Sequence, residues 1–134
     1  MSTNYFGLSI PKTKEWEERK AKSIEEAGEM KGLIPIIEEY YEKYKPKEIH
    51  IGKSSMGWDF LFNYNGGKYY TNKLELLNWL ETLNIYDEYG KSITAGELWH
   101  IVTNYKGRTH RSETQYASMY LLIDGLEFLD SEFS

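Results

Sequence analysis

One stretch of the chain carries most of its structural information, and it runs Glu48-Ile49-His50-Ile51-Gly52-Lys53-Ser54-Ser55-Met56-Gly57-Trp58-Asp59-Phe60. Isoleucines alternate with His50 in its first part, and aromatic residues alternate with other residues in its last part. Such alternation is typical of strands, and glycines commonly mark the turn between two strands. The stretch therefore predicts a strand, a tight loop over Gly52–Gly57, and a second, aromatic strand.

The predicted Gly52–Gly57 loop is more polar than a plain hairpin requires. Backbone amides around small residues, together with Lys53 and two hydroxyls, favour a site for a phosphate or a carboxylate. The loop is not a Walker A motif, because Lys47 stands where that motif needs its first glycine. The alternative interpretation is a serine-rich turn with a solvated lysine.

Residues 12–45 predict a helical hairpin inserted after a short strand at residues 3–8. Residues 12–31 are strongly charged, with opposite charges four residues apart, so this first helix buries only a thin apolar stripe. Gly32 is placed to end it. Pro35 suits the first turn of a second helix, in which Ile36, Tyr40 and Tyr44 recur at helical spacing.

The C-terminal part of the chain predicts further turns and helices. Asn65-Gly66-Gly67 predicts a hairpin with a returning strand at residues 68–70. Asn72 and Thr94 each precede a glutamate by three residues and predict helix caps. The first of these helices is expected to bury Leu74, Leu77, Leu80 and Leu83, and a turn is expected at Asp87-Glu88-Tyr89-Gly90. The pattern leaves helix and strand open for residues 114–123.

These elements predict an α+β fold in a single domain, residues 1–134. A small antiparallel sheet would form from segments near residues 3–8, 48–52, 57–64 and 68–71 and from the tail. Helices would pack on one face of this sheet, with the helical hairpin of residues 12–45 as an insertion.

Composition and charge exclude several classes of function. The net charge of −5 argues against nucleic-acid and anionic-membrane binding, since both need a cationic face. Cysteine is absent, and the three histidines lack metal-ligand spacing, so we expect no metal and no cofactor. No apolar run is long enough to span a bilayer, which suggests a cytoplasmic protein. No serine, histidine or carboxylate arrangement indicates catalysis.

Aromatic residues make up 16% of the chain, and tyrosine and tryptophan are prominent at protein interfaces. Tyrosine-rich packing of the core is the alternative interpretation. Two candidate sets follow. The candidate partner-binding residues are Trp16, Tyr40, Tyr41, Tyr44 and Trp99. The candidate ligand-binding residues are His50, Lys53, Ser54, Ser55, Trp58 and Tyr89, with Trp58 or Tyr89 available to stack on a base.

Several segments together resemble a family of small, mostly uncharacterised proteins of bacteriophages and bacterial mobile elements. The segments are Asn4-Tyr5, His50-Ile51-Gly52-Lys53-Ser54-Ser55 with Gly57-Trp58 and Phe60, Trp79, Asp87-Glu88-Tyr89-Gly90, and Glu132-Phe133-Ser134. Relatives carry the patterns HIGKSSxGWxF and DEYG, and many also carry a Cys-x-x-Cys knuckle that suits a metal. Here the helical hairpin replaces that knuckle, so metal binding is not carried over.

The resemblance implies a phage accessory protein that adjusts or disarms the host. Our first hypothesis is non-covalent binding that inhibits a host or anti-phage defence protein, with the hairpin tyrosines as anchors. The alternative is a phosphate- or nucleotide-binding protein that sequesters, or less readily hydrolyses, a small signalling ligand through the Gly52–Gly57 loop. A homodimer is compatible with either. The resemblance also suggests that the loop and the Asp87–Gly90 turn lie close together.

Overall fold

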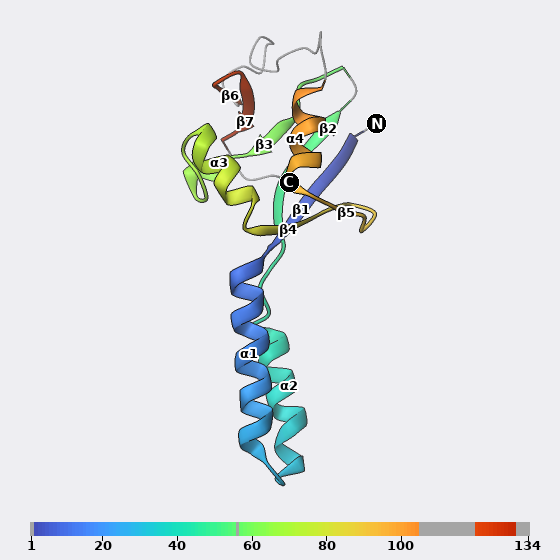
Figure 1. Ribbon diagram of the computed structural model, residues 1–134, viewed down its shortest axis with the longest axis vertical. Coiled ribbons are helices and arrows are strands. Elements are labelled where there is room, and N and C mark those ends of the chain that lie inside the picture. Colours follow the sequence, from blue (N-terminus) through green and yellow to red (C-terminus); the bar gives the residue numbers. More distant parts are fainter. Residues whose placement is uncertain (1, 56, 105–119, 131–134) are drawn as a thin grey trace. The chain divides into compact units, whose positions relative to one another are not determined.

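The computed structural model describes residues 2–55, 57–104 and 120–130 (Figure 1). The chain divides into two compact units. The sheet unit comprises residues 1–7 and 49–134, and the hairpin unit comprises residues 8–48.

Within the described residues of the sheet unit, seven strands form one sheet in the order β5-β4-β1-β2-β3-β7-β6. The pairs β1/β2, β2/β3, β4/β5 and β6/β7 are antiparallel, and β3/β7 is parallel, so the sheet is mixed. The strands are β1 (Ser2–Ser9), β2 (Ile49–Ser55), β3 (Leu61–Asn63), β4 (Leu83–Asp87), β5 (Ser92–Ile93), β6 (Tyr120–Ile123) and β7 (Leu126–Leu129).

Two helices, α3 (Lys73–Leu80) and α4 (Ala95–Thr103), pack on this sheet. Both contribute fully buried leucines to a core that the sheet completes with aliphatic and aromatic side chains. The predicted α+β class, with helices packing on a sheet, is confirmed, but the antiparallel sheet of the prediction is wrong, because β7 pairs with β3 in parallel. The core contains Tyr5, Ile51, Phe60, Phe62, Tyr70, Leu76, Leu80, Leu83, Ile85, Leu98 and Phe128.

The Gly52–Gly57 loop was expected at the wrong place, because β2 continues through Gly52 as far as Ser55. Gly52 pairs with Tyr5 of β1 and with Phe62 of β3. A Cβ atom at this position would lie 2.4 Å from the Leu61 carbonyl oxygen and 2.6 Å from the Phe60 ring. Gly52 is therefore a packing residue of a strand, and the turn comes later, at Gly57 with φ of 81°.

The returning strand at residues 68–70 does not form. Asn65, Gly66 and Gly67 have the positive φ values that the sequence predicts, but they form the short 3₁₀ turn η2 (Asn65–Gly67). The edge of β3 is occupied by β7 instead. Tyr70 turns into the core, where its hydroxyl donates to the Asn63 carbonyl oxygen at 2.8 Å and burial raises its pKa.

The helix caps agree with the sequence. The Asn72 side chain accepts from the Glu75 N–H at 2.8 Å, and Thr94 and Glu97 form a complete capping box. Glu75 accepts from the main-chain N–H and hydroxyl of Thr71, and these hydrogen bonds lower the pKa of its carboxyl.

The buried side of α3 differs from the prediction. Leu76 and Leu80 are buried, whereas Leu74 is exposed and Leu77 is half-buried. Leu83 is buried as predicted, but it belongs to β4.

The hairpin unit contains α1 (Ile10–Ala27), the turn η1 (Lys31–Leu33) and α2 (Ile34–Lys43). The Ser9 hydroxyl caps α1 at its start, and Gly28, with φ of 58°, ends it, so the predicted stop at Gly32 is four residues late. Pro35 lies in the first turn of α2, as predicted. The inserted helical hairpin is confirmed.

The undecided segment at residues 114–123 is only partly described. Residues 120–123 form β6, and the remainder lies outside the described residues.

Candidate functional site

The predicted ligand-binding residues of β2 lie on two faces of the sheet. Asn4 and Lys53 are register partners, and so are Thr3 and Ser54. Because side chains alternate along a strand, Lys53 and Ser55 project to one face and Ser54 projects to the other. The backbone N–H groups of an extended, paired strand also alternate between its two neighbours, so they do not converge on a single anion.

Asn4 connects β2 to the Asp87–Gly90 turn through hydrogen bonds. Its main-chain N–H donates to Glu88 Oε1 at 3.0 Å, and its carbonyl oxygen accepts from the Glu88 N–H at 2.9 Å. On the other side, His50 Nε2 lies 3.0 Å from Asn4 Oδ1, an acceptor, so His50 donates to it. The two motifs that carry the resemblance thus meet β1 from opposite sides.

The rings of Tyr86, Phe6 and His50, from three neighbouring strands, form a row in contact with one another. The Phe6 ring stacks on His50 with centroids 4.8 Å apart, and on Tyr86 of β4 with centroids 6.0 Å apart. His50 therefore has the role of a packed and hydrogen-bonded strand residue. Phe6 and Tyr86 were not singled out from the sequence, and Asn4 and Glu88 were named only within segments of the resemblance, because the β5-β4-β1-β2 strand order that unites them has no local signature.

The two predicted stacking residues lie in turns. Tyr89 is 76% exposed in the β4–β5 turn, where Asp87 Oδ1 accepts from the N–H groups of Tyr89 and Lys91, both at 2.9 Å. Trp58 is partly exposed after β2, and its main-chain N–H donates to the Ser55 carbonyl oxygen at 3.1 Å. These two residues therefore lie in two different turns, Trp58 after β2 and Tyr89 after β4.

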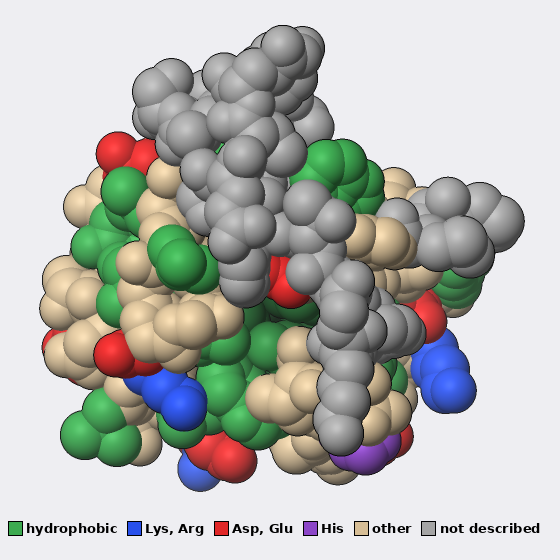
Figure 2. All heavy atoms as spheres, turned by 90° about the horizontal axis from the view of Figure 1, so that it is seen from above, with side chains coloured by type: hydrophobic (Ala, Val, Ile, Leu, Met, Phe, Trp, Pro, Cys, Tyr) green, Lys and Arg blue, Asp and Glu red, His purple; other side chains and the backbone are tan. Residues whose placement is uncertain are grey.

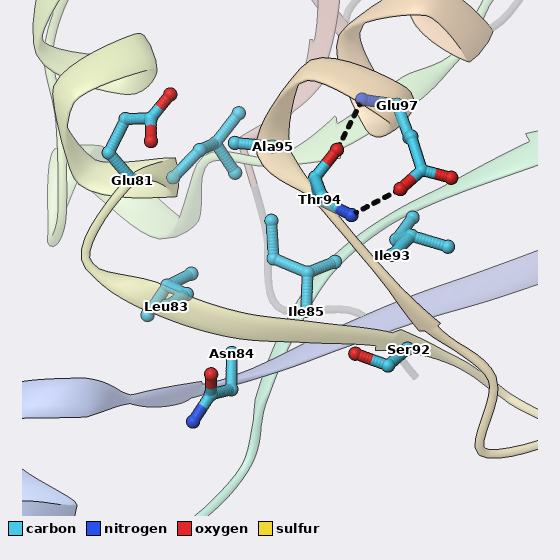
Figure 3. A pocket seen from close by; sticks show the side chains of 10 residues that line it. Glu81, Leu83, Asn84, Ile85, Ser92, Ile93, Thr94, Ala95 and Glu97 are labelled. Atoms are coloured by element: carbon cyan, nitrogen blue, oxygen red, sulfur yellow. Dashed lines mark hydrogen bonds between the residues drawn. The ribbon is translucent and has the colours of Figure 1, made fainter.

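A cleft of about 340 Å³ lies where α3 ends and α4 begins (Figure 3). Ile85 and Ala95 line it, with Glu81 and Glu97 on opposite sides of the view. Glu97 accepts from the Thr94 N–H at 3.1 Å in the capping box. One of the two acids is thus engaged in holding the helix, and among the residues that the structure describes, no histidine, lysine or arginine lines this cleft. It supports no catalytic assignment.

On the face of the molecule seen in Figure 2, the described lysines and arginines appear as small separate groups among acidic, polar and hydrophobic side chains.

The hairpin unit exposes a row of large apolar side chains. Leu33, Ile36, Tyr40 and Tyr44 follow one another at steps of three and four residues, which places them on one face of α2. Their exposed fractions are 41%, 62%, 56% and 59%. The rings of Tyr40 and Tyr44 are in contact, with centroids 4.7 Å apart. We call these four residues the apolar stripe.

Trp16 and Tyr41 hold the two helices of the hairpin together. The indole N–H of Trp16 donates to the Tyr41 carbonyl oxygen at 2.7 Å, and the Tyr41 hydroxyl is 2.9 Å from the Ser23 hydroxyl. Both side chains are half-buried. Of the predicted anchors, only Tyr40 and Tyr44 present most of their surface to solvent.

Beside the stripe lies a hollow of about 390 Å³, which we call the Trp16 hollow. From α1 it is lined by Lys12, Glu15, Trp16 and Arg19. From α2 and the residues after it, Tyr40, Tyr41, Tyr44 and Pro46 complete the lining. Apolar ring surface with a few polar groups is typical of binding pockets.

Trp99 belongs to the sheet unit and not to the hairpin. It is half-buried against the core, with its ring 6.4 Å from that of Phe62 and Lys73 Nζ 5.8 Å from its centroid. The predicted partner-binding residues are therefore divided between the two units.

Two further searches cover the part of the chain that the structure describes. In residues 2–55, 57–104 and 120–130, no group of three or more histidine or acidic side chains is placed to hold a metal ion. Among the helices in these ranges, none is long and apolar enough to cross a membrane.

Comparison of the sequence with protein-family models, with curated proteins and with solved structures finds no match.

Proposed function

We propose that this protein acts by binding another protein non-covalently, and that the apolar stripe of α2 is the principal contact. The observation that carries this proposal is the exposure of four large apolar side chains in succession along one helix face. Contiguous exposed apolar surface of this kind marks interaction sites in soluble proteins. Many proteins also bind a partner through one face of a helix, with apolar anchor residues three and four positions apart.

The biological role that fits the sequence is that of a phage accessory protein that inhibits a host or anti-phage defence protein. Its support is the resemblance of the Asn4-Tyr5, HIGKSS and DEYG segments to phage proteins. The absence of a catalytic constellation in the described residues is compatible with a protein that acts by occupancy. The stripe and the resemblance are independent, so each can fail alone.

The test begins with capture of bacterial host proteins on the tagged full-length chain and identification by mass spectrometry. The affinity of the purified partner is then compared between the wild type and a Tyr40→Ala, Tyr44→Ala variant. Removal of an interface tyrosine at a hot spot costs about 2 kcal/mol, so we expect a loss of at least roughly thirtyfold in Kd. Inhibition of the partner's activity should fall in parallel.

The matched control is Tyr89→Ala, which removes the 76% exposed tyrosine of the sheet unit. It should leave partner affinity unchanged. Equal affinity of the wild type and the Tyr40/Tyr44 variant, with both folded by circular dichroism, would contradict the assignment of the stripe. Loss of affinity in Tyr89→Ala alone would move the interface to the sheet unit.

A further inference from the structure

The charges around the Trp16 hollow indicate the chemistry of its occupant. Lys20 Nζ and Lys45 Nζ lie 5.3 and 6.0 Å from the centroid of the Trp16 ring, and Lys43 Nζ lies 5.9 Å from that of Tyr44. Lys12 lines the hollow directly. Four ammonium groups therefore surround one cluster of aromatic rings.

The acidic group in the lining does not offset these cations. Glu15 forms an ion pair with Arg19 at 2.7 Å, so the two lining charges compensate each other. With 3.6 residues per turn, Glu38 and Glu42 lie about half a turn away from Tyr40, on the opposite side of α2. The local balance at the hollow is positive, although the chain as a whole carries −5.

This combination selects against two simple kinds of ligand. An aromatic cluster by itself favours a cation, but here lysines already lie over the ring faces, and a further cation is repelled. A bare anion would meet the lysines but would leave the apolar ring surface of the tyrosines in the lining uncovered. The occupant therefore needs an apolar group for the rings and negative charges for the rim.

We propose that the Trp16 hollow receives an acidic segment of the partner protein, with one aromatic or aliphatic side chain inserted and aspartates or glutamates on either side. This inference rests on the proposed function, and it specifies the partner surface that α1 and α2 recognise together. Complementary charge at an interface directs the choice of partner and its orientation more than it adds affinity. A nucleic acid is disfavoured, because the chain carries a net charge of −5 and the described cations gather around a single hollow.

The direct test uses defined probes and the full-length chain. The first probe is a fluorescein-labelled peptide with one central phenylalanine, two glutamates on each side and glycine ends. The second has lysines in place of the glutamates, the third has alanine in place of phenylalanine, and the fourth is a short oligo-dT. By fluorescence anisotropy we expect the first peptide to bind at least about tenfold tighter than each of the others, and more weakly as salt is added.

Charge reversal at the rim should remove this preference. Lys43→Glu combined with Lys45→Glu should weaken the binding of the acidic peptide by roughly five- to tenfold, as expected when two exposed ion pairs are converted to repulsion. The matched control is Lys22→Glu with Lys31→Glu, which makes the same change in net charge on exposed lysines of the same unit that neither line the hollow nor lie over the Trp16 or Tyr44 ring. It should retain binding. A Lys43→Gln, Lys45→Gln variant, which keeps the helix propensity of α2, should show a smaller loss of the same sign.

Three results would overturn the inference. They are equal binding of the acidic and basic peptides, equal loss in the two charge-reversal variants, and preferential binding of oligo-dT. Binding of the captured partner by the two sets of variants distinguishes a wrong inference about the acidic segment from a wrong assignment of the stripe. If the Tyr40/Tyr44 variant loses the partner while Lys43→Glu, Lys45→Glu keeps it, the stripe stands and the acidic segment is wrong. If neither variant loses it, neither the stripe nor the hollow is the contact, and the interface lies elsewhere on the chain.

Discussion

Gly52 shows how a single residue determines the geometry around the HIGKSS motif. Its missing side chain allows the Leu61 carbonyl and the Phe60 ring to approach the backbone. A Cβ atom at this position would lie only 2.4 Å from the Leu61 carbonyl oxygen and 2.6 Å from the Phe60 ring. We expect Gly52→Ala to lower the free energy of unfolding by about 2–3 kcal/mol, the typical cost of forcing atoms into a packed site. Urea denaturation followed by far-UV circular dichroism measures this change.

The matched control is Gly96→Ala in α4, where the nearest atom to the new Cβ would lie at an ordinary 3.8 Å. Alanine there replaces a glycine in a helix, so stability should stay the same or rise. A Gly52→Ala protein within about 0.5 kcal/mol of the wild type would show that β3 does not pack on β2 as described.

Gly52 also shows the limit of sequence interpretation for the candidate site. Between two isoleucines and two serines, a glycine indicates a turn by local rules, and the ligand loop was predicted on that basis. Its actual role depends on Phe60 and Leu61, which reach it only because β3 pairs with β2. The distribution of the polar residues of the motif over two faces likewise follows from the strand, which the prediction of a loop did not include.

Helix caps are the elements that local sequence predicts best, because the residues involved are three apart. In α4 the Thr94 hydroxyl accepts from the Glu97 N–H at 3.0 Å, and the Glu97 carboxylate accepts from the Thr94 N–H at 3.1 Å. We expect Thr94→Ala to cost about 1 kcal/mol in the free energy of unfolding. Thr94→Ser, which keeps the hydroxyl, should cost much less, and equal losses in the two variants would contradict the capping role.

Strand pairing shows the opposite behaviour, because its determinants are far apart in the chain. Leu61 pairs with Glu127 and Phe62 with Phe128 in the parallel β3/β7 ladder, and no local pattern indicates this partnership. The sequence instead suggested that Tyr69 and Tyr70 return beside β3, since Asn-Gly-Gly is a strong hairpin signal. The turn has the expected positive φ values, but β7 occupies the edge. The local sequence thus determines the conformation of a turn, but it does not determine which strand pairs with which.

At the scale of the whole molecule, the hairpin unit is inserted between two residues that pair with each other. The chain leaves the sheet unit after Gly7 and returns at Ile49, and these two residues are register partners in the β1/β2 ladder. The periodicity of residues 12–45 predicted the two helices of this unit, because charged and aromatic residues there follow helical spacing, and the resemblance suggested that they are an insertion. The paired ends are close enough for a two-residue turn to connect them.

This arrangement allows the two units to be tested separately. We expect a chain in which Asn-Gly replaces residues 8–48 to keep the sheet unit folded, since the core residues of that unit all lie outside the excised segment. Heteronuclear NMR spectra should retain dispersed resonances for β1, β2 and α4. The same chain should lose the captured partner completely, because the apolar stripe and the Trp16 hollow are removed with the hairpin. A folded, excised protein that still inhibits the partner would assign the function to the sheet unit, and the Asn4–Glu88 connection would then be the surface to mutate.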